Sequence, residues 1–334
     1  MRSFQRVKQD MKYLFFDIEC AGVFKNVAKI CAFGYCLTDE QFHILEKEDL
    51  LINPKGGFHL TDRKGSRGLV LPYEYDKFKE YPTFPEVVDK IRSLLEDEDT
   101  LVAGHATMND VKYLNLETNR FSLPSFRFSF ADTQFLYMNK IADFSRQYAL
   151  GAIAESLGVE FTAHRAVDDA YATMKIAEAI CKETGLTLPQ LLEKYEIVAG
   201  KIENYEITQT TSRAFRQHQA AVNRKKELRE QKRAEVHRFI DREKRNRNRS
   251  GALKAKRFCL SHPLEEQVEL AKKLIKAAFA QGCYYSYKAE ECEYYVAFAT
   301  ENGARLKSAI EQKARVFTPE EFEEFLKKSG AGTD

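Results

Sequence analysis

Residues 12–37 read KYLFFDIECAGVFKNVAKICAFGYCL and contain two apolar, β-rich runs, 12–19 and 30–37. We expect both runs to form adjacent buried strands. Side chains two positions apart on a strand point to the same side, so the pattern predicts that Asp17 and Glu19 project together, opposite to Phe16 and Ile18. Two neighbouring carboxylates on an apolar strand repel each other unless a cation lies between them.

Strand and helix signals alternate from this stretch to about residue 195. Thr83 and Glu86 have the spacing of a capping box at the start of a helix. Further strands are predicted at 100–105 and around 126–130, and further helices at 149–158 and 167–185. Residues 55–81 contain four glycines and one proline and predict a long loop. The pattern indicates an α/β or α+β domain over residues 10–195.

The composition excludes several classes of protein. The chain has 334 residues, 44% of them apolar and 31% charged, which fits a soluble globular protein with two domains. No stretch is apolar enough for a signal peptide or a membrane span, so no membrane partner is expected. The seven cysteines are scattered without a C-x-x-C pair, which indicates reduced thiols in a cytoplasmic protein.

Positive charge is concentrated in one segment. Residues 211–250 hold fourteen basic and five acidic residues, a net charge of +9 in a chain whose total is +2. We expect residues 196–250 to form an exposed, mostly helical linker. Six of its residues are candidates for sequence-independent binding of nucleic acid: Arg224, Lys225, Lys226, Arg229, Lys232 and Arg233. A solvated helical spacer is the alternative.

The C-terminal part, residues 251–330, has a compact pattern of its own. Its apolar runs predict the order strand, helix, strand, strand, helix, strand, helix. Thr318, Pro319 and Glu321 supply the cap, the first-turn proline and the capping-box glutamate of the last helix. The pattern predicts a small βαββαβα domain.

Two further carboxylates are predicted to face inward. Asp110 lies on the side of a helix that carries Val111 and Leu114. At 100° per residue, Asp169 shares a face with Thr173, Ile176 and Ile180, whereas Asp168 shares a face with Lys175 and Lys182. Asp169 is therefore the inward carboxylate of the pair. His164 can approach it only from a loop before the helix.

These residues predict a metal site. Four carboxylates, Asp17, Glu19, Asp110 and Asp169, form an oxygen-only ligand set that suits Mg²⁺ or Mn²⁺. Four exceed what one such ion takes from a protein, so we expect two divalent cations that share Asp17. Paired ions of this kind serve in-line displacement at phosphorus. His164 is the candidate for accepting the proton of the attacking water.

The ordered motifs resemble those of the DEDDh 3′→5′ exonucleases. D-x-E at Asp17 and Glu19, H-x4-D ending at Asp110, and H-x-A-x-x-D-A from His164 look like the family's motifs, and the similarity extends over residues 12–185. The resemblance implies a ribonuclease H-like fold with a mixed sheet, metal ligands at the four carboxylates and a general base at His164. Cys20 replaces the family's usual threonine.

The last eighty or so residues resemble a BRCT domain. The segments KRFCLSHPLEE, EYYVAF and GARLKSAIEQKARVFTPEEF carry the likeness, although the usual Gly-Gly turn and the tryptophan are missing. The resemblance implies either phosphate binding through Ser261 and Arg305 or a structural or protein-docking role, as two equal alternatives.

The sequence therefore predicts a metal-dependent 3′→5′ exonuclease that acts on DNA, in repair or replication, with a replication or repair protein as the partner of the BRCT-like domain. An RNA exonuclease of the same family is one alternative. A non-catalytic adaptor that binds DNA ends or a partner is the other, and the complete carboxylate set argues against it.

Overall fold

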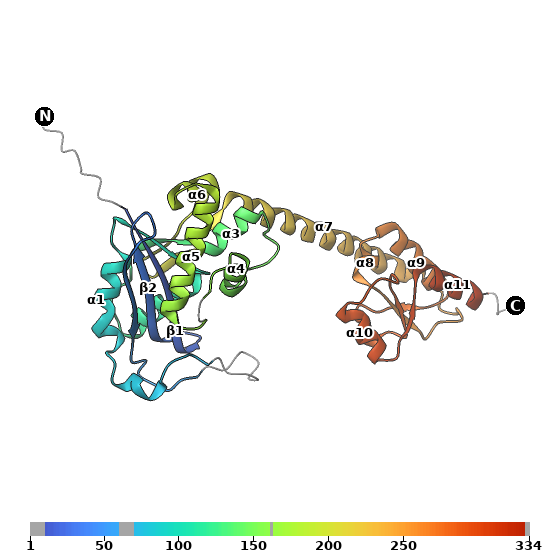
Figure 1. Ribbon diagram of the computed structural model, residues 1–334. Coiled ribbons are helices and arrows are strands. Elements are labelled where there is room, and N and C mark those ends of the chain that lie inside the picture. The colour runs from blue at the N-terminus through green and yellow to red at the C-terminus, as the bar shows by residue number, and fades with distance from the viewer. Residues whose placement is uncertain (1–10, 60–69, 161–162, 331–334) are drawn as a thin grey trace. The chain divides into compact units, whose positions relative to one another are not determined.

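The computed structural model describes residues 11–59, 70–160 and 163–330 (Figure 1). The chain divides into two compact units, Met1–Gln219 and Ala220–Asp334. In the described part of the chain, no helix is both long enough and apolar enough to cross a bilayer. All seven cysteines are buried and free, as the sequence predicts.

The N-terminal unit is built on a mixed sheet of seven strands in the described residues. The order across the sheet is β3 (Ile44–Leu51), β2 (Val27–Thr38), β1 (Lys12–Phe24), β4 (Thr100–Gly104), β5 (Phe128–Asp132), β7 (Gly200–Glu203) and β8 (Glu206–Thr208). Strand β1 runs antiparallel to β2 and parallel to β4, while β2–β3, β5–β7 and β7–β8 are antiparallel pairs and β4–β5 is parallel.

Helices cover both faces of this sheet (Figure 1). On one face, Leu14, Phe16 and Ile18 of β1 pack in a core with α1 (Phe84–Leu95) and α2 (Met108–Arg120). On the other face, Tyr13 and Phe15 pack in a core with four helices: α3 (Thr133–Ile141), α4 (Leu150–Ser156), α5 (Ala166–Thr184) and α6 (Leu188–Lys194). The alternation of β1 therefore directs Asp17 and Glu19 to the α5 face.

Two local signals of the sequence are found in the structure. Thr83 and Glu86 form the capping box of α1. The loop predicted at 55–81 contains one short 3₁₀ helix, η1 (Tyr75–Lys79), in the residues described, and residues 60–69 lie outside them. The described parts of this loop carry a small aromatic core that includes Phe58, Tyr73 and Phe78.

The prediction of a linker over residues 196–250 is wrong at both of its ends. β7 and β8 extend the sheet of the N-terminal unit, and β6 (Ile197–Val198) pairs with β9 (Thr211–Ser212). Helix α7 (Arg213–Glu243) follows, and near its end Val236 and Ile240 are fully buried in the core of the C-terminal unit. Only the middle of the segment is exposed helix, because Val236 and Ile240 anchor the last turns of α7 in the core of the C-terminal unit.

The C-terminal unit contains a four-stranded parallel sheet in the order β11–β10–β12–β13. The predicted βαββαβα order is found, with the short elements η2 (Lys244–Asn246), α8 (His262–Glu265) and η3 (Ala289–Glu291) in addition. The main elements are β10 (Arg257–Leu260), α9 (Val268–Ala280), β11 (Tyr284–Tyr285), β12 (Tyr294–Val296), α10 (Ala304–Glu311), β13 (Arg315–Phe317) and α11 (Pro319–Gly330). Thr318 and Glu321 exchange the capping hydrogen bonds that the sequence predicts.

Candidate metal centre

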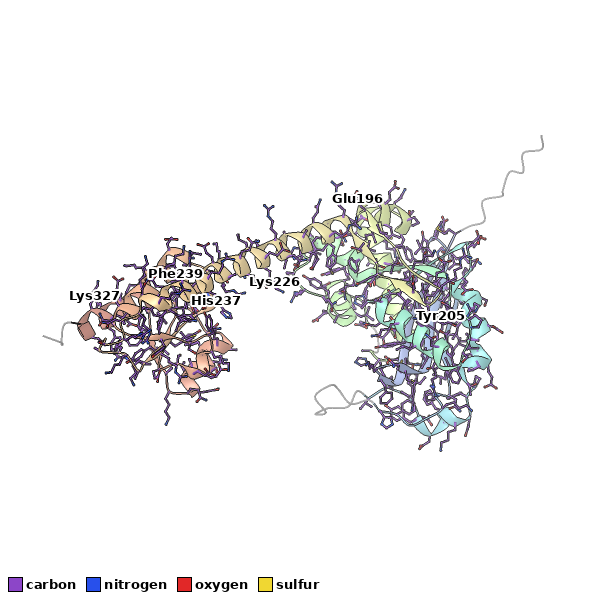
Figure 2. The ribbon with its side chains drawn as sticks, turned by 180° about the vertical axis from the view of Figure 1, so that it is seen from behind. Glu196, Tyr205, Lys226, His237, Phe239 and Lys327 are labelled. Atoms are coloured by element: carbon purple, nitrogen blue, oxygen red, sulfur yellow. The ribbon has the colours of Figure 1, made fainter. Side chains whose placement is uncertain are left out.

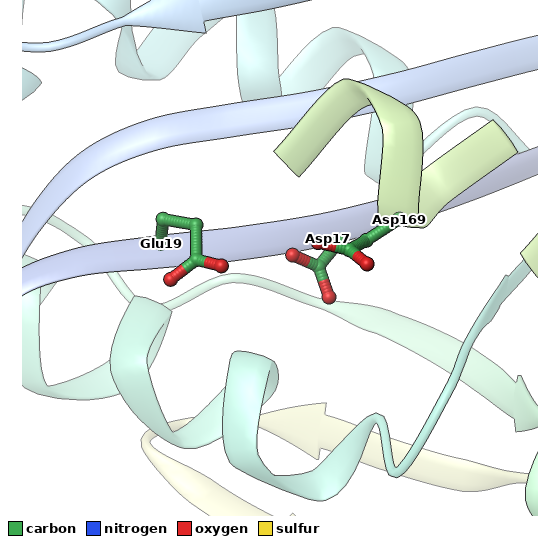
Figure 3. Close-up of side chains that lie close together, drawn as sticks. All are labelled: Asp17, Glu19 and Asp169. Carbon is green, nitrogen blue, oxygen red and sulfur yellow. The ribbon is translucent and has the colours of Figure 1, made fainter. Parts of the chain in front are cut away.

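Three carboxylates converge on the α5 face of β1. One ligand atom from each of Asp17, Glu19 and Asp169 lies within 4.8 Å of the other two (Figure 3). Asp17 and Glu19 are partly exposed, whereas Asp169 is 7% exposed. A β-bulge follows Glu19 directly, so the regular pairing of β1 with β2 ends where the second carboxylate projects.

A glycine allows α5 to bring Asp169 to this strand. Gly34 of β2 pairs with Asp17, and a Cβ atom added to Gly34 would lie 2.0 Å from the carbonyl carbon of Ala166 and 2.1 Å from the nitrogen of Val167. The first turn of α5 therefore rests directly on the backbone of β2. Any side chain at position 34 would displace the helix that carries Asp169.

The fourth predicted ligand, Asp110, reaches the same strand from α2. Its Oδ1 accepts a hydrogen bond of 3.2 Å from the backbone nitrogen of Ile18, which lies between Asp17 and Glu19 in the chain. Asp110 is buried and is not one of the three residues within 4.8 Å. The structure thus brings Asp110 to the edge of the cluster.

The electrostatics of the cluster favour a bound cation. Burial, with repulsion from Asp169 and Asp49, raises the pKa of Asp17 well above its ordinary value. Burial, with repulsion from Asp17, raises the pKa of Glu19 to about 9. Burial raises the pKa of Asp169 to about 7 and that of Asp110 well above its ordinary value. Burial and mutual repulsion thus disfavour the charged forms of these carboxyls unless positive charge lies beside them, and their hard oxygen donors suit Mg²⁺ or Mn²⁺.

His164 and Asp168 lie where the helical geometry predicts. His164 is exposed in the turn before α5 with a positive φ of 69°, and its backbone N–H donates to the Asp169 carboxylate. Histidine is among the residues enriched in this left-handed region. Asp168 is not one of the three clustered carboxylates and forms long ion pairs, 3.8 Å to Lys47 and 3.9 Å to Arg165.

A second network of hydrogen bonds lies beside the cluster, and no sequence pattern indicates it. Asp49 of β3 pairs with Gly34 in register, so it lies in the same row across the sheet as Asp17. The Tyr73 hydroxyl donates to Asp49 at 3.1 Å and accepts a hydrogen bond of 3.0 Å from the backbone nitrogen of Ala166. The network fixes the start of α5. No local pattern could reveal it, because the contact depends on the register of three strands.

The predicted nucleic-acid-binding residues lie on α7. Arg224, Lys225, Lys226, Arg229 and Lys232 are exposed and Arg233 is partly buried, and Figure 2 shows Lys226 on this helix. Lys226 and Arg229 have only long ion pairs, of 3.9 Å to Glu230 and 3.5 Å to Glu266. The helix therefore presents a row of cations to solvent.

The two residues predicted to bind phosphate have partners within the protein. Ser261 is fully buried, and its hydroxyl donates to Glu301 at 2.6 Å. Arg305 donates to His262 at 2.6 Å and to the Tyr287 carbonyl at 2.9 Å. The Ser261 hydroxyl already donates to the negatively charged Glu301, which would repel a phosphate at the same place. Phosphate binding by Ser261 and Arg305 therefore stays a prediction.

A family model matches the part of the chain that holds the metal centre. Residues 14–177 match the family model described as Exonuclease, RNase T type. No curated protein sequence matches the chain. The family match supports a hydrolytic exonuclease domain, and it spans every predicted ligand of the metal centre together with His164.

Several solved structures are similar at low identity. A 3′-exonuclease that recognises the 3′ end of a histone mRNA stem-loop is 16% identical with a TM-score of 0.48, over 61% of this chain and 92% of that one. A full-length 3′-exonuclease is 17% identical with a TM-score of 0.46, over 61% and 67%. E. coli exonuclease I with an oligonucleotide is 18% identical with a TM-score of 0.41, over 56% of this chain and 43% of its own. The chain thus spans less than half the length of exonuclease I.

Proposed function

We propose that this protein is a metal-dependent 3′→5′ exonuclease of the DEDDh type that releases nucleotides from the 3′ ends of DNA. The observation that carries the proposal is the convergence of Asp17, Glu19 and Asp169 within 4.8 Å on one face of the sheet. Three acidic groups at that separation, with raised pKa values, are costly to the fold unless they serve a cation.

The donor set fits a pair of hard divalent cations. Asp17, Glu19 and Asp169 would hold them, and Asp110 would join once its side chain leaves the Ile18 amide. Bound Mg²⁺ or Mn²⁺ supplies Lewis-acid stabilisation of the charge that develops on the phosphodiester. The chain's own contribution is placement: β1 fixes two carboxylates, and Gly34 allows α5 to add the third.

His164 is the proposed general base. Its place in an exposed turn leaves the imidazole access to solvent, and the hydrogen bond from its backbone to Asp169 ties that turn to the metal ligands. A neutral imidazole at this place can accept the proton of the attacking water.

DNA is favoured as the substrate by two features outside the metal centre. The exposed cations of α7 suit a polyanion without sequence preference. The parallel sheet and element order of the C-terminal unit support a BRCT-like domain, which would direct the enzyme to a replication or repair partner. An RNA substrate is the second candidate, because the metal centre itself contacts only the phosphodiester in this scheme.

The experiment is digestion of end-labelled single-stranded DNA, duplex DNA and RNA with Mg²⁺ or Mn²⁺. We expect shortening from the 3′ end by the wild-type protein, and its loss in Asp17→Ala and Asp169→Ala. Asp168→Ala is the matched control and should retain activity, because Asp168 is not one of the clustered carboxylates and pairs with Lys47 instead. Unchanged digestion by Asp17→Ala and Asp169→Ala would refute the site, and binding without digestion by the wild type would favour an adaptor.

A further inference from the structure

A cavity separate from the carboxylate cluster opens in the N-terminal unit at the ends of β4 and β5. Its volume is about 330 Å³, which is within the range of small-ligand sites. Four stretches of chain line it: the turn after β4, the first turns of α3, the segment 144–147, and residues 209–219 at and before the start of α7. None of the residues proposed above as metal ligands lines this cavity.

Aromatic rings form one part of the wall. The ring centroids of Phe135 and Phe215 are 5.1 Å apart and those of Phe144 and Phe215 are 6.2 Å apart, both with edge-to-face geometry. Phe135 is buried, whereas Phe144 and Phe215 are partly exposed and present ring surface to the cavity. Such rings offer a flat apolar surface to a planar ligand.

Amide side chains form the other part. Asn109, Gln147, Gln209 and Gln219 are all exposed, and within the described residues none of their side chains has a hydrogen-bond partner. Each amide offers both a donor and an acceptor, as the edge of a nucleobase does. Four unpaired amides around aromatic rings therefore match a base better than a purely apolar ligand.

The charges around the cavity suit the backbone of a nucleic acid. The single carboxylate in the wall, Asp132, is engaged by the backbone N–H groups of Ala106, Thr107 and Gln134 at 2.9–3.1 Å. Arg146 is exposed in the wall, and its guanidinium lies 4.7 Å from the ring centroid of Tyr148. A phosphate at the rim would thus meet a cation.

The cavity and the metal centre share one turn of chain. Asn109 lines the cavity, and the next residue is Asp110, which contacts β1 between Asp17 and Glu19. Asp17 and Glu19 follow the last residue pair of β1 with β4, Phe15 with Ala103, and the turn that lines the cavity follows the end of β4. A strand whose terminal phosphodiester reaches the carboxylates can therefore extend to the mouth of the cavity.

We propose that this cavity receives one unpaired nucleobase of the substrate strand, upstream of the terminal nucleotide. The base stacks on Phe144 and Phe215 and exchanges hydrogen bonds with the amides, while Arg146 contacts a neighbouring phosphate. The inference rests on the proposed function, and it restricts the substrate to a strand that is single-stranded near its 3′ end.

The test is binding of fluorescent single-stranded DNA, measured by anisotropy without divalent ions. The full chain carries Asp17→Asn, which removes a proposed metal ligand so that residual metal does not support digestion. Each oligonucleotide has one abasic site, moved stepwise from the 3′ end. We expect one or two positions at which the missing base weakens binding about tenfold, as loss of a stacked base does.

The same series with Phe144→Ala added should lose this position dependence, because the stacking partner is gone. Phe144→Leu keeps the apolar volume without the ring and should behave alike, and thermal unfolding checks that both variants fold. Gln219→Ala should weaken binding, whereas Gln217→Ala, two residues away and outside the cavity, is the matched control.

Equal binding of all abasic oligonucleotides, or a position dependence that survives Phe144→Ala, would overturn the inference. Absence of any binding would do the same. The proposed function is tested separately by digestion with the wild-type chain. Position-dependent binding without digestion would support the base-binding cavity and refute the proposed nuclease activity. Digestion without position dependence would support the nuclease activity and refute the base-binding cavity.

Discussion

Removing one carboxylate from the metal centre should stabilise the protein when no metal is bound. Burial raises the pKa of Asp169 from 3.8 to about 7, so the folded state binds a proton more tightly than the unfolded chain. A tenfold change in proton affinity corresponds to about 1.4 kcal/mol, and the charged Asp169 therefore costs on the order of 4 kcal/mol above pH 7. Asp169→Asn keeps the shape and removes this cost.

The sign of the pH dependence follows from the same shift. A carboxyl whose pKa is raised on folding destabilises the folded state above that raised pKa, and the cost declines to nothing as the pH falls to 3.8. In divalent-free buffer at pH 8, Asp169→Asn should therefore raise Tm by roughly 10 °C, since 1 kcal/mol moves the Tm of a unit of this size by about 2–4 °C. At pH 4 the two proteins should unfold together.

Calorimetry at pH 8 and pH 4, with and without Mn²⁺, measures these effects. Mn²⁺ should raise the Tm of the wild type at pH 8 and have less effect on Asp169→Asn, which reverses their order. Asp168→Asn is the control, and its change should stay within about 1 kcal/mol because Asp168 forms only long, partly exposed ion pairs. A lower Tm for Asp169→Asn at pH 8 without metal, or an equal gain at both pH values, would refute the reasoning.

Three further substitutions test the contacts that hold helices α5 and α7 in place. Gly34→Ala should displace α5 and abolish both metal-dependent stabilisation and digestion, because its Cβ would lie 2.0 Å from Ala166; normal Mn²⁺ binding in a titration would contradict this. Tyr73→Phe removes the hydroxyl that accepts from the Ala166 nitrogen, so kcat should fall more than tenfold with little change in KM, and an unaltered kcat would exclude a positioning role. Ile240→Ala should cost the C-terminal unit about 2–5 kcal/mol in denaturant unfolding, whereas exposed Val222→Ala should cost under about 0.5 kcal/mol, and equal costs would show that α7 is not anchored there.

The side-chain periods of strands and helices account for what the sequence could predict of the metal centre. The two-residue period of β1 places Asp17 and Glu19 on one side, and the 3.6-residue period of α5 separates buried Asp169 from Asp168. These are local rules that need no knowledge of the neighbouring elements. The mixed α/β architecture of the first unit follows from the same alternation of patterns.

The features that the sequence could not predict depend on contacts between distant segments. Asp49 reaches the row of Asp17 only through the register of β3 on β2, and β3 itself is a charged edge strand with no distinctive pattern. The strands β7 and β8 have four and three residues, too few for a periodic signal. The burial of Ile240 likewise depends on a core formed by residues beyond 257.

The order in which the ribosome makes the chain gives the metal centre a built-in delay. Asp17 and Glu19 emerge first, and Asp169 follows about 150 residues later, on a helix that must then close onto Gly34. A growing polypeptide that has not reached Asp169 lacks one of the three clustered carboxylates, so the proposed exonuclease could not act on the nucleic acids around it during translation. The proposed hydrolytic activity would thus be withheld until the helix that carries Asp169 has been synthesised and packed.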